Sequence, residues 1–104
     1  MPTVVFADIV GSTGLFEQLG GANASQLMSS LTTLAGKVFE QHQGRVVKML
    51  GDGVFAVFSD AGNALTACMA LQSRFLTEPI IPIGRTTPVQ MQMGVESGDL
   101  VEID

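Results

Sequence analysis

Apolar and polar residues alternate with different periods along the chain, and each period predicts a kind of element. Residues 4–7 are consecutive apolar residues rich in β-branched side chains, which is typical of a short buried strand. Leucine and valine recur at helical spacing over residues 27–38. This spacing predicts a helix that is capped by Asn23 or Ser25 and ends at Gln43.

Shorter patterns complete the first and last thirds of the chain. Residues 15–19 predict a short amphipathic helix, which a pair of glycines ends. Two apolar runs at 45–50 and 54–58 read as strands, and the Gly-Asp-Gly turn at 51–53 between them is a hairpin signal. Residues 89–96 alternate apolar and polar side chains and predict a further strand.

A third helix is expected to begin after Asp60, which suits an N-cap, and to extend to about Thr77. The proline-punctuated segment 78–88 predicts a loop, and residues 100–103 predict the start of a fifth strand. The methionines are expected to fill the core. The inward positions of the third helix are expected to be Leu65, Cys68, Met69, Leu71 and Phe75.

The order of these elements is β-α-α-β-β-α-β with a trailing strand, over one domain spanning residues 1–104. It predicts an α+β fold of the ferredoxin-like, or palm-like, type: an antiparallel sheet with helices on one face. In that topology the strands at 4–7 and 54–58 are neighbours at the centre of the sheet. The end of the first strand therefore lies beside the hairpin.

Composition restricts the partners and the setting. Ten acidic against five basic residues give a net charge of −5, which argues against a nucleic acid partner. No apolar run is long enough to span a membrane, and the single Cys68, among apolar neighbours, suggests a buried thiol in a reducing compartment. We therefore expect a cytoplasmic protein. With 14% charged residues and a mean hydropathy of +0.39, we also expect a buried partner surface.

The candidate chemistry begins at the end of the first strand. Asp8 follows the apolar run, where a carboxylate is costly to bury unless it is paired or bound to a cation. The turn at 11–13, Gly-Ser-Thr, can open a helix whose free N–H groups and hydroxyls face an anion. A carboxylate beside such a turn suits a metal-bound phosphate.

Asp52 is the second candidate acid. An Asp in a tight turn needs no other role, because Asp tolerates a positive φ. Its glycine neighbours, however, let a large ligand approach, and the predicted topology brings Asp52 close to Asp8. Two carboxylates suit two Mg²⁺ or Mn²⁺ ions that carry a triphosphate, with one ion activating the attacking hydroxyl and the other neutralising the leaving pyrophosphate.

Three segments then resemble one family in the same order and spacing. Residues 6–13 (FADIVGST) resemble the first metal-binding segment of class III nucleotide (adenylate and guanylate) cyclases. Residues 48–53 (KMLGDG) resemble the second metal segment, and residues 93–98 (MGVESG) resemble the strand that follows. The resemblance implies conversion of ATP or GTP to the 3′,5′-cyclic nucleotide and pyrophosphate, the reaction of a phosphorus–oxygen lyase.

The resemblance also implies residue roles. Asp8 and Asp52 are the metal carboxylates, and Ile9 lends a backbone carbonyl to one ion. Lys48 matches the position whose lysine selects adenine, so the implied substrate is ATP; the alternative is an ordinary strand lysine. The implied phosphate-binding residues are Val10, Gly11, Ser12 and Thr13.

The chain departs from the family at its end. Family members continue into a segment with an Asn that positions the ribose and an Arg that stabilises charge on the phosphate. Asn63 has no Arg at the matching spacing and cannot replace them. The chain therefore resembles the N-terminal, metal-binding portion of the catalytic domain. Family sites form between two head-to-tail subunits, so the resemblance implies a homodimer. Without the Asn and Arg segment we expect this piece to be inactive alone, and we expect self-association through the sheet surface that the segment would cover.

Two other functions remain open. A non-catalytic cyclase-homology module could bind nucleotide or a partner for regulation; the missing Asn and Arg favour it, and the retained metal carboxylates argue against it. A diguanylate cyclase shares the palm-like topology and carries its own motif on the same hairpin. Leu50 and Gly53 stand where that motif needs a glycine and an acid, which disfavours it.

Overall fold

A computed structural model of the protein describes residues 2–98. The expected fifth strand at 100–103 lies outside this range. The sheet is antiparallel with the strand order β2-β3-β1-β4, so the first strand has a neighbour on each side. This confirms the predicted α+β, palm-like fold. The elements in chain order are β1 (Thr3–Ile9), α1 (Ser12–Leu19), α2 (Gly21–Gln41), β2 (Arg45–Met49), β3 (Gly53–Phe58), α3 (Ala61–Thr77) and β4 (Met91–Ser97).

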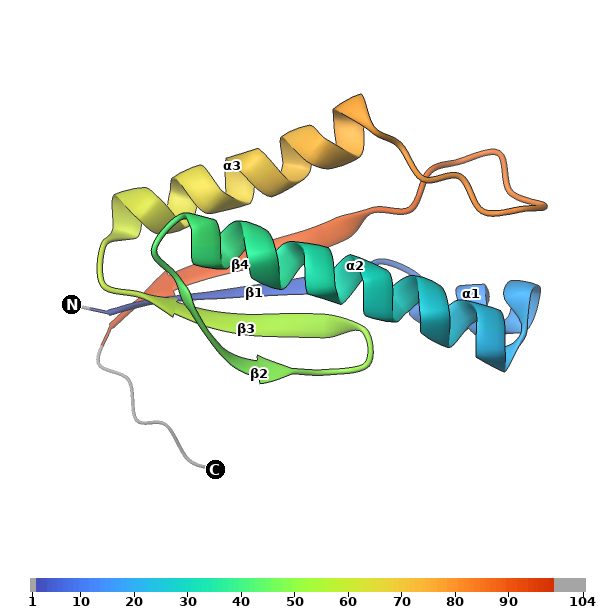
Figure 1. The fold of residues 1–104 in the computed structure, drawn as a ribbon, viewed down its shortest axis with the longest axis horizontal. Helices are drawn as coiled ribbons and strands as arrows, with labels where there is room; N and C mark the ends of the chain where they lie inside the picture. Colours follow the sequence, from blue (N-terminus) through green and yellow to red (C-terminus); the bar gives the residue numbers. More distant parts are fainter. Residues whose placement is uncertain (1, 99–104) are drawn as a thin grey trace.

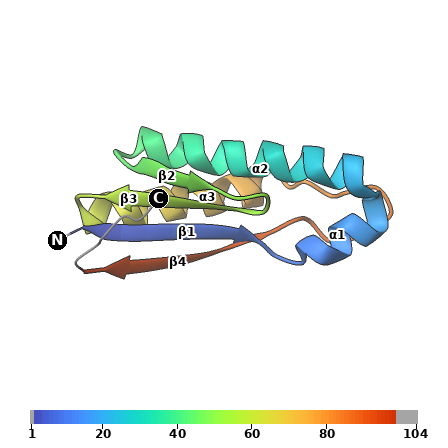
Figure 2. The same ribbon diagram turned by 90° about the horizontal axis from the view of Figure 1, so that it is seen from below.

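Helices α2 and α3 lie on one face of the sheet, as Figures 1 and 2 show from two directions. Alternate residues of β1 point into the core between sheet and helices, and the others point to the opposite face. The rings of Phe39 on α2 and Phe58 on β3 meet edge to face, with centroids 6.1 Å apart. The opposite face has no helix over it within residues 2–98, and we call it the open face.

Cross-strand register places one row of residues across the open face. Lys48 on β2 pairs with Phe55 on β3, Phe55 pairs with Phe6 on β1, and Phe6 pairs with Gly94 on β4. The rings of Phe6 and Phe55 have centroids 5.9 Å apart. A Cβ at residue 94 would overlap the Phe6 ring, so the glycine there gives the ring its place. Asp8 lies one row further along β1 on this same face.

The structure corrects two expectations about the helices. Helix α2 begins at Gly21, after Gly20 with a φ of 82°, rather than after a cap at Asn23 or Ser25. Two expected core positions of α3 are wrong, since Leu65 is 54% exposed and Met69 is 72% exposed. The buried stripe of α3 lies on small residues instead, which lets the helix approach the sheet closely. It consists of Ala64, Ala67, Leu71 and Phe75.

The methionines divide between core and surface. Met28 and Met91 are buried as expected, whereas Met49 is 48% exposed. Cys68 is half-buried rather than buried, and this partial burial raises the pKa of its thiol.

The N-terminal cap of α3 is the one that the sequence predicts. Asp60 accepts a hydrogen bond of 2.8 Å from the Gly62 amide, as predicted for an N-cap. At the C-terminal end of α2, the Nδ1 atom of His42 lies 2.8 Å from the Val38 carbonyl oxygen. No helix within the described residues is long and apolar enough to cross a membrane.

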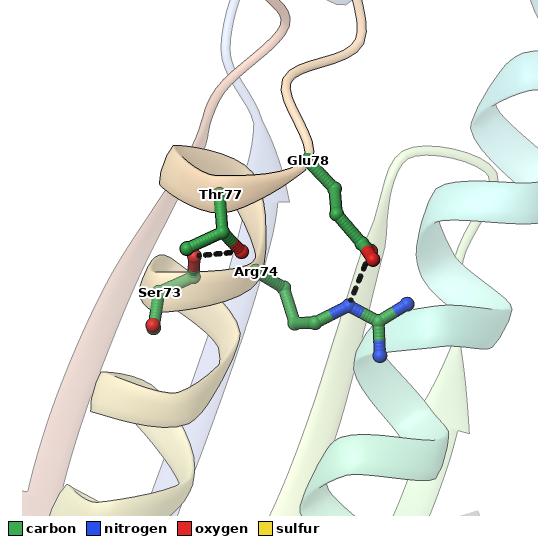
Figure 3. A network of polar contacts seen from close by, with 4 residues as sticks. All are labelled: Ser73, Arg74, Thr77 and Glu78. Atoms are coloured by element: carbon green, nitrogen blue, oxygen red, sulfur yellow. Dashed lines mark hydrogen bonds and ion pairs between the residues drawn. The ribbon is translucent and has the colours of Figure 1, made fainter.

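The C-terminal end of α3 carries an exposed polar network, shown in Figure 3. Arg74 Nε and Glu78 Oε2 form an ion pair of 2.9 Å between side chains that are 50% and 68% exposed. Thr77 donates a hydrogen bond of 2.9 Å to the Ser73 carbonyl. A solvent-exposed pair of this kind contributes little stability. The segment 78–90 that follows has no strand or helix. This confirms the predicted loop over 78–88, whereas β4 begins at Met91 rather than at the predicted Val89.

Candidate metal and phosphate site

Asp8 is the penultimate residue of β1 and is half-buried on the open face. It lies directly across from Gly53 of β3 and from Gln92 of β4. A Cβ at residue 53 would overlap the Asp8 Oδ1 oxygen and approach the Ala7 carbonyl oxygen to 3.0 Å. The glycine at 53 therefore gives the Asp8 carboxylate its room on the sheet surface.

Asp52 lies in the tight turn between β2 and β3, next to Gly53. The backbone carbonyl of Asp52 accepts a 2.8 Å hydrogen bond from the Ile9 amide, which ties the turn to the end of β1. Its side-chain Oδ2 accepts a 3.1 Å hydrogen bond from the Ser12 hydroxyl. Of residues 2–98, Gln43 is the single non-glycine with a positive φ. The turn therefore does not need Asp52 for a left-handed conformation, and that explanation for the acid is removed.

The β1–α1 turn lies next to both acids. Gly11 has a φ of 71° and a ψ of 35°, a left-handed conformation that a side chain would strain. No side chain in the described range caps the first turn of α1, so its amides lack a protein partner of that kind. The Val10 amide, by contrast, donates to the Gln90 carbonyl at 2.9 Å and is already used. The amides that follow Gly11 are therefore without a side-chain cap, and the Ser12 side chain of this turn reaches Asp52.

Lys48 is not brought next to Asp8. It is exposed on β2, and β3 lies between β2 and β1. Two inter-strand spacings place the Lys48 backbone about 10 Å from β1. Lys48 belongs to the Phe6 row of the open face, and Asp8 belongs to the next row. A ligand that contacts both residues within one chain would have to extend across the sheet.

A cavity of about 560 Å³ adjoins Asp52 on the helix side of the hairpin. It lies between the turn of residues 49–52 and the N-terminal half of α2. Its α2 wall carries Ser25, Ser29 and Thr33, which are spaced four residues apart and share one face of the helix. The sequence reasoning missed this cavity and the Ser12–Asp52 hydrogen bond, although the four-residue spacing of the hydroxyls was a usable signal.

The donor set suits a hard divalent cation. Asp8 and Asp52 supply carboxylate oxygens from the same end of the β1–β3 pair, and no cluster of three or more His, Cys, Asp or Glu side chains occurs within residues 2–98. Mg²⁺ is typically held by one or two carboxylates together with substrate phosphates. The space kept by Gly53 over the sheet is where such an ion would meet the Asp8 carboxylate.

The sequence as a whole matches a known family. Residues 2–102 match the family described as the adenylate and guanylate cyclase catalytic domain. The chain belongs to this family. The cyclase segments predicted to bind metal are those that form β1, the β1–α1 turn and the β2–β3 hairpin.

Several cyclases are similar to the chain over part of their length. Putative adenylate cyclase 3 of Rhizobium meliloti (strain 1021) is 30% identical over 105 residues, covering 100% of this chain and 18% of the relative. An adenylate cyclase of Streptomyces griseus is 34% identical over 86 residues, covering 80% of this chain and 22% of the relative. The chain thus spans about a fifth of the length of these curated relatives.

Solved cyclase structures share the fold. The non-canonical dimeric guanylyl cyclase domain of the RhoGC fusion protein from Blastocladiella emersonii superposes with a TM-score of 0.76 at 16% identity, over 99% of this chain and 62% of that chain. A bacterial light-regulated adenylyl cyclase gives a TM-score of 0.79 at 19% identity, over 90% of this chain and 29% of that chain. At these identities the likeness establishes the cyclase fold.

Proposed function

We propose that the chain supplies the metal-binding half of a nucleotide cyclase site that converts ATP to 3′,5′-cyclic AMP and pyrophosphate. The observation that carries the proposal is the double attachment of Asp52, through Ile9 to β1 and through Ser12 to α1. These bonds fix Asp52 at the same end of the β1–β3 pair as Asp8, beside the β1–α1 turn. Membership of the cyclase family supports the reaction class.

In this proposal Asp8 and Asp52 hold two Mg²⁺ or Mn²⁺ ions, with the Ile9 carbonyl as a further ligand. Such ions favour deprotonation of the attacking ribose hydroxyl and neutralise the leaving pyrophosphate. The Ser12 hydroxyl holds one oxygen of Asp52 and leaves the other for the cation. The amides after Gly11, with Thr13, orient the phosphates at the start of α1.

Adenine selection is assigned to Lys48. Because Lys48 lies about two strands from β1, its adenine contact fits a site completed by a second subunit better than a site within one chain. We therefore propose that ATP binds between two copies, one providing Asp8 and Asp52 and the other providing Lys48.

Calorimetric titration of Mn²⁺, with a non-hydrolysable ATP analogue present, tests the metal site. We expect Asp8→Asn and Asp52→Asn each to weaken Mn²⁺ binding at least tenfold, because each removes a charged ligand. Asp60→Asn is the matched control, since Asn also caps α3 and residue 60 lies outside the site. If both site variants bind Mn²⁺ as the parent does, the assignment is wrong.

A further inference from the structure

A second cavity lies beside the end of β1, on the loop side of Asp8. It has a volume of about 280 Å³ and is bounded by Val10, by Arg85 and by residues 87–90 of the α3–β4 loop. Arg85, Thr87 and Gln90 contribute its polar side chains. Unlike the cavity next to Asp52, it therefore combines a guanidinium with uncharged groups that can donate hydrogen bonds.

The loop that carries Arg85 is fixed to the candidate site. Gln18 on α1 donates a 2.9 Å hydrogen bond from Nε2 to the Gly84 carbonyl. The Arg85 amide donates to the Pro82 carbonyl at 3.0 Å, and the Val10 amide donates to the Gln90 carbonyl at 2.9 Å. Figures 1 and 2 show the loop extending beyond the sheet at the end where α1 lies. Arg85 is thereby held next to the β1–α1 turn.

The cavity lies next to the strand end that carries Asp8. Val10, which lines the cavity, follows Asp8 by two positions, in the turn directly after β1. Two residues of extended chain span at most about 7 Å. Val10 is 47% exposed, whereas Ile9, between the two, is 4% exposed. An anion bound to a cation at Asp8 can therefore extend toward Arg85 at this end of the sheet.

Charge distribution distinguishes Arg85 from the other basic residues. Arg74 pairs with Glu78 on the outer end of α3, and Lys37 is exposed on α2. Arg45 and Lys48 lie on β2, with β3 between them and β1. Arg85 is half-buried and forms no ion pair with a side chain in the described part of the chain. In a chain of net charge −5, a polyphosphate needs local positive charge to bind.

From this placement we infer that Arg85, with Thr87 and Gln90, forms a binding subsite for the polyphosphate end of the nucleotide. A guanidinium can donate two parallel hydrogen bonds to phosphate oxygens, and the hydroxyl and amide add neutral donors. The inference rests on the proposed function, and it assigns the α3–β4 loop as the second wall of the phosphate site, opposite the first turn of α1.

Titration of inorganic tripolyphosphate with Mn²⁺ into the 104-residue chain tests this subsite without base or ribose. We expect Arg85→Gln to weaken tripolyphosphate binding about tenfold or more, because a charge-assisted contact is lost. Arg85→Lys should restore part of the affinity, since it keeps the charge but loses the paired donors. Arg74→Gln removes the same charge on the exposed end of α3 and should leave the affinity unchanged. Thermal unfolding of each variant reports whether the fold is kept.

The outcomes separate this inference from the proposed function. Unchanged tripolyphosphate affinity in Arg85→Gln overturns the subsite, as does an equal loss in Arg74→Gln or an absence of binding by the parent. Asp52→Asn tests the metal site independently. If tripolyphosphate binding depends on Arg85 but not on Asp52, the phosphate subsite stands and the proposed two-metal function fails.

Discussion

The Ser12 hydroxyl donates a hydrogen bond of 3.1 Å to Oδ2 of Asp52. This bond joins two residues that lie 40 positions apart in the sequence. The bond connects the first residue of α1 to the β2–β3 turn, so one side chain sets the orientation of a candidate metal ligand. An Asp held in one rotamer loses less freedom when it binds a cation. The small hydroxylated residue after Gly11 therefore has a role in aligning the site.

We expect Ser12→Ala to weaken Mn²⁺ binding several-fold while lowering the free energy of unfolding by only about 1 kcal/mol, the usual contribution of one hydrogen bond. Calorimetry and urea unfolding measure the two effects. Ser30→Ala is the control, because the Ser30 hydroxyl bonds to the Gln26 carbonyl of its own helix. Equal Mn²⁺ affinity in Ser12→Ala and in the parent would show that the bond does not orient Asp52.

Gly53 is predicted to be essential for the Asp8 carboxylate. In Gly53→Ala the new Cβ would overlap Asp8 Oδ1 and press on the Ala7 carbonyl, so Asp8 must move. We expect a loss of about 1–3 kcal/mol in the free energy of unfolding, typical of overpacking, together with weaker Mn²⁺ binding.

Gly51→Ala is the matched control in the same turn. A Cβ at residue 51 meets no atom within 4 Å, and Gly51 does not have a positive φ. Its unfolding free energy and Mn²⁺ affinity should stay close to those of the parent. Similar losses in the two variants would indicate a general sensitivity of the hairpin to substitution, and not a contact with Asp8.

Much of the fold could be predicted from periodicity and turn residues. The run at 4–7, the hairpin around Asp52 and the cap at Asp60 all behave as local physical chemistry dictates, and they fix the element order. The inward face of α3 could not be predicted in the same way. Its buried positions include Ala64 and Ala67, because close approach of the helix to the sheet favours small side chains over Leu65 and Met69. Hydropathy alone would place the more apolar Leu65 and Met69 in the core ahead of the two alanines.

Part of the candidate site could likewise be predicted from the sequence, and part could not. The sequence could place Asp8 and Asp52 at the same end of the sheet, because antiparallel pairing sets the C-terminal end of β1 beside the N-terminal end of β3. The Ser12–Asp52 bond and the cavity at Arg85 depend on the path of loops, which no periodic pattern encodes. Lys48 shows the limit of motif reading, because its spacing of four residues from Asp52 does not reveal that β3 lies between Lys48 and the strand that carries Asp8.

Lys48 is predicted to favour adenine over guanine. Its ammonium group can donate a hydrogen bond to the N1 acceptor of adenine, whereas guanine presents a donor at that position. We expect Lys48→Glu to shift the ratio of ATP to GTP affinity toward GTP by about tenfold, within the range for one buried hydrogen bond to a charged group. Competition binding of the two nucleotides, with Mn²⁺ present, measures the ratio.

Lys37→Glu provides the control, because Lys37 is exposed on α2 and the variant has the same net charge as Lys48→Glu. It should lower the affinity for both nucleotides equally, if at all. An ATP-to-GTP ratio that is the same in the parent and in Lys48→Glu would contradict the assignment.

The 104-residue chain is predicted to turn over ATP slowly or not at all. In the proposed site Asp8 and Asp52 hold cations and Arg85 binds phosphate, but transition-state stabilisation also needs groups that position the ribose. The two asparagines of the sequence do not supply one, since Asn23 donates to the Leu19 carbonyl within the helical region and Asn63 lies on α3. Loss of one preorganised donor typically lowers the rate by about 10²–10³. A cyclic-nucleotide assay with Mn²⁺ and ATP measures this rate.

The comparison for that assay is a chain extended through the Asn and Arg segment of the cyclase family, at matched concentration. Sedimentation should accompany it, because Met69 and Leu76 are 72% and 83% exposed on α3 and favour self-association of the shorter chain. We expect the extended chain to be at least 100-fold faster, in line with the loss of one or more such donors. Comparable rates would place the decisive groups within the 104 residues and would direct attention to Arg85 and the hydroxyls near Asp52.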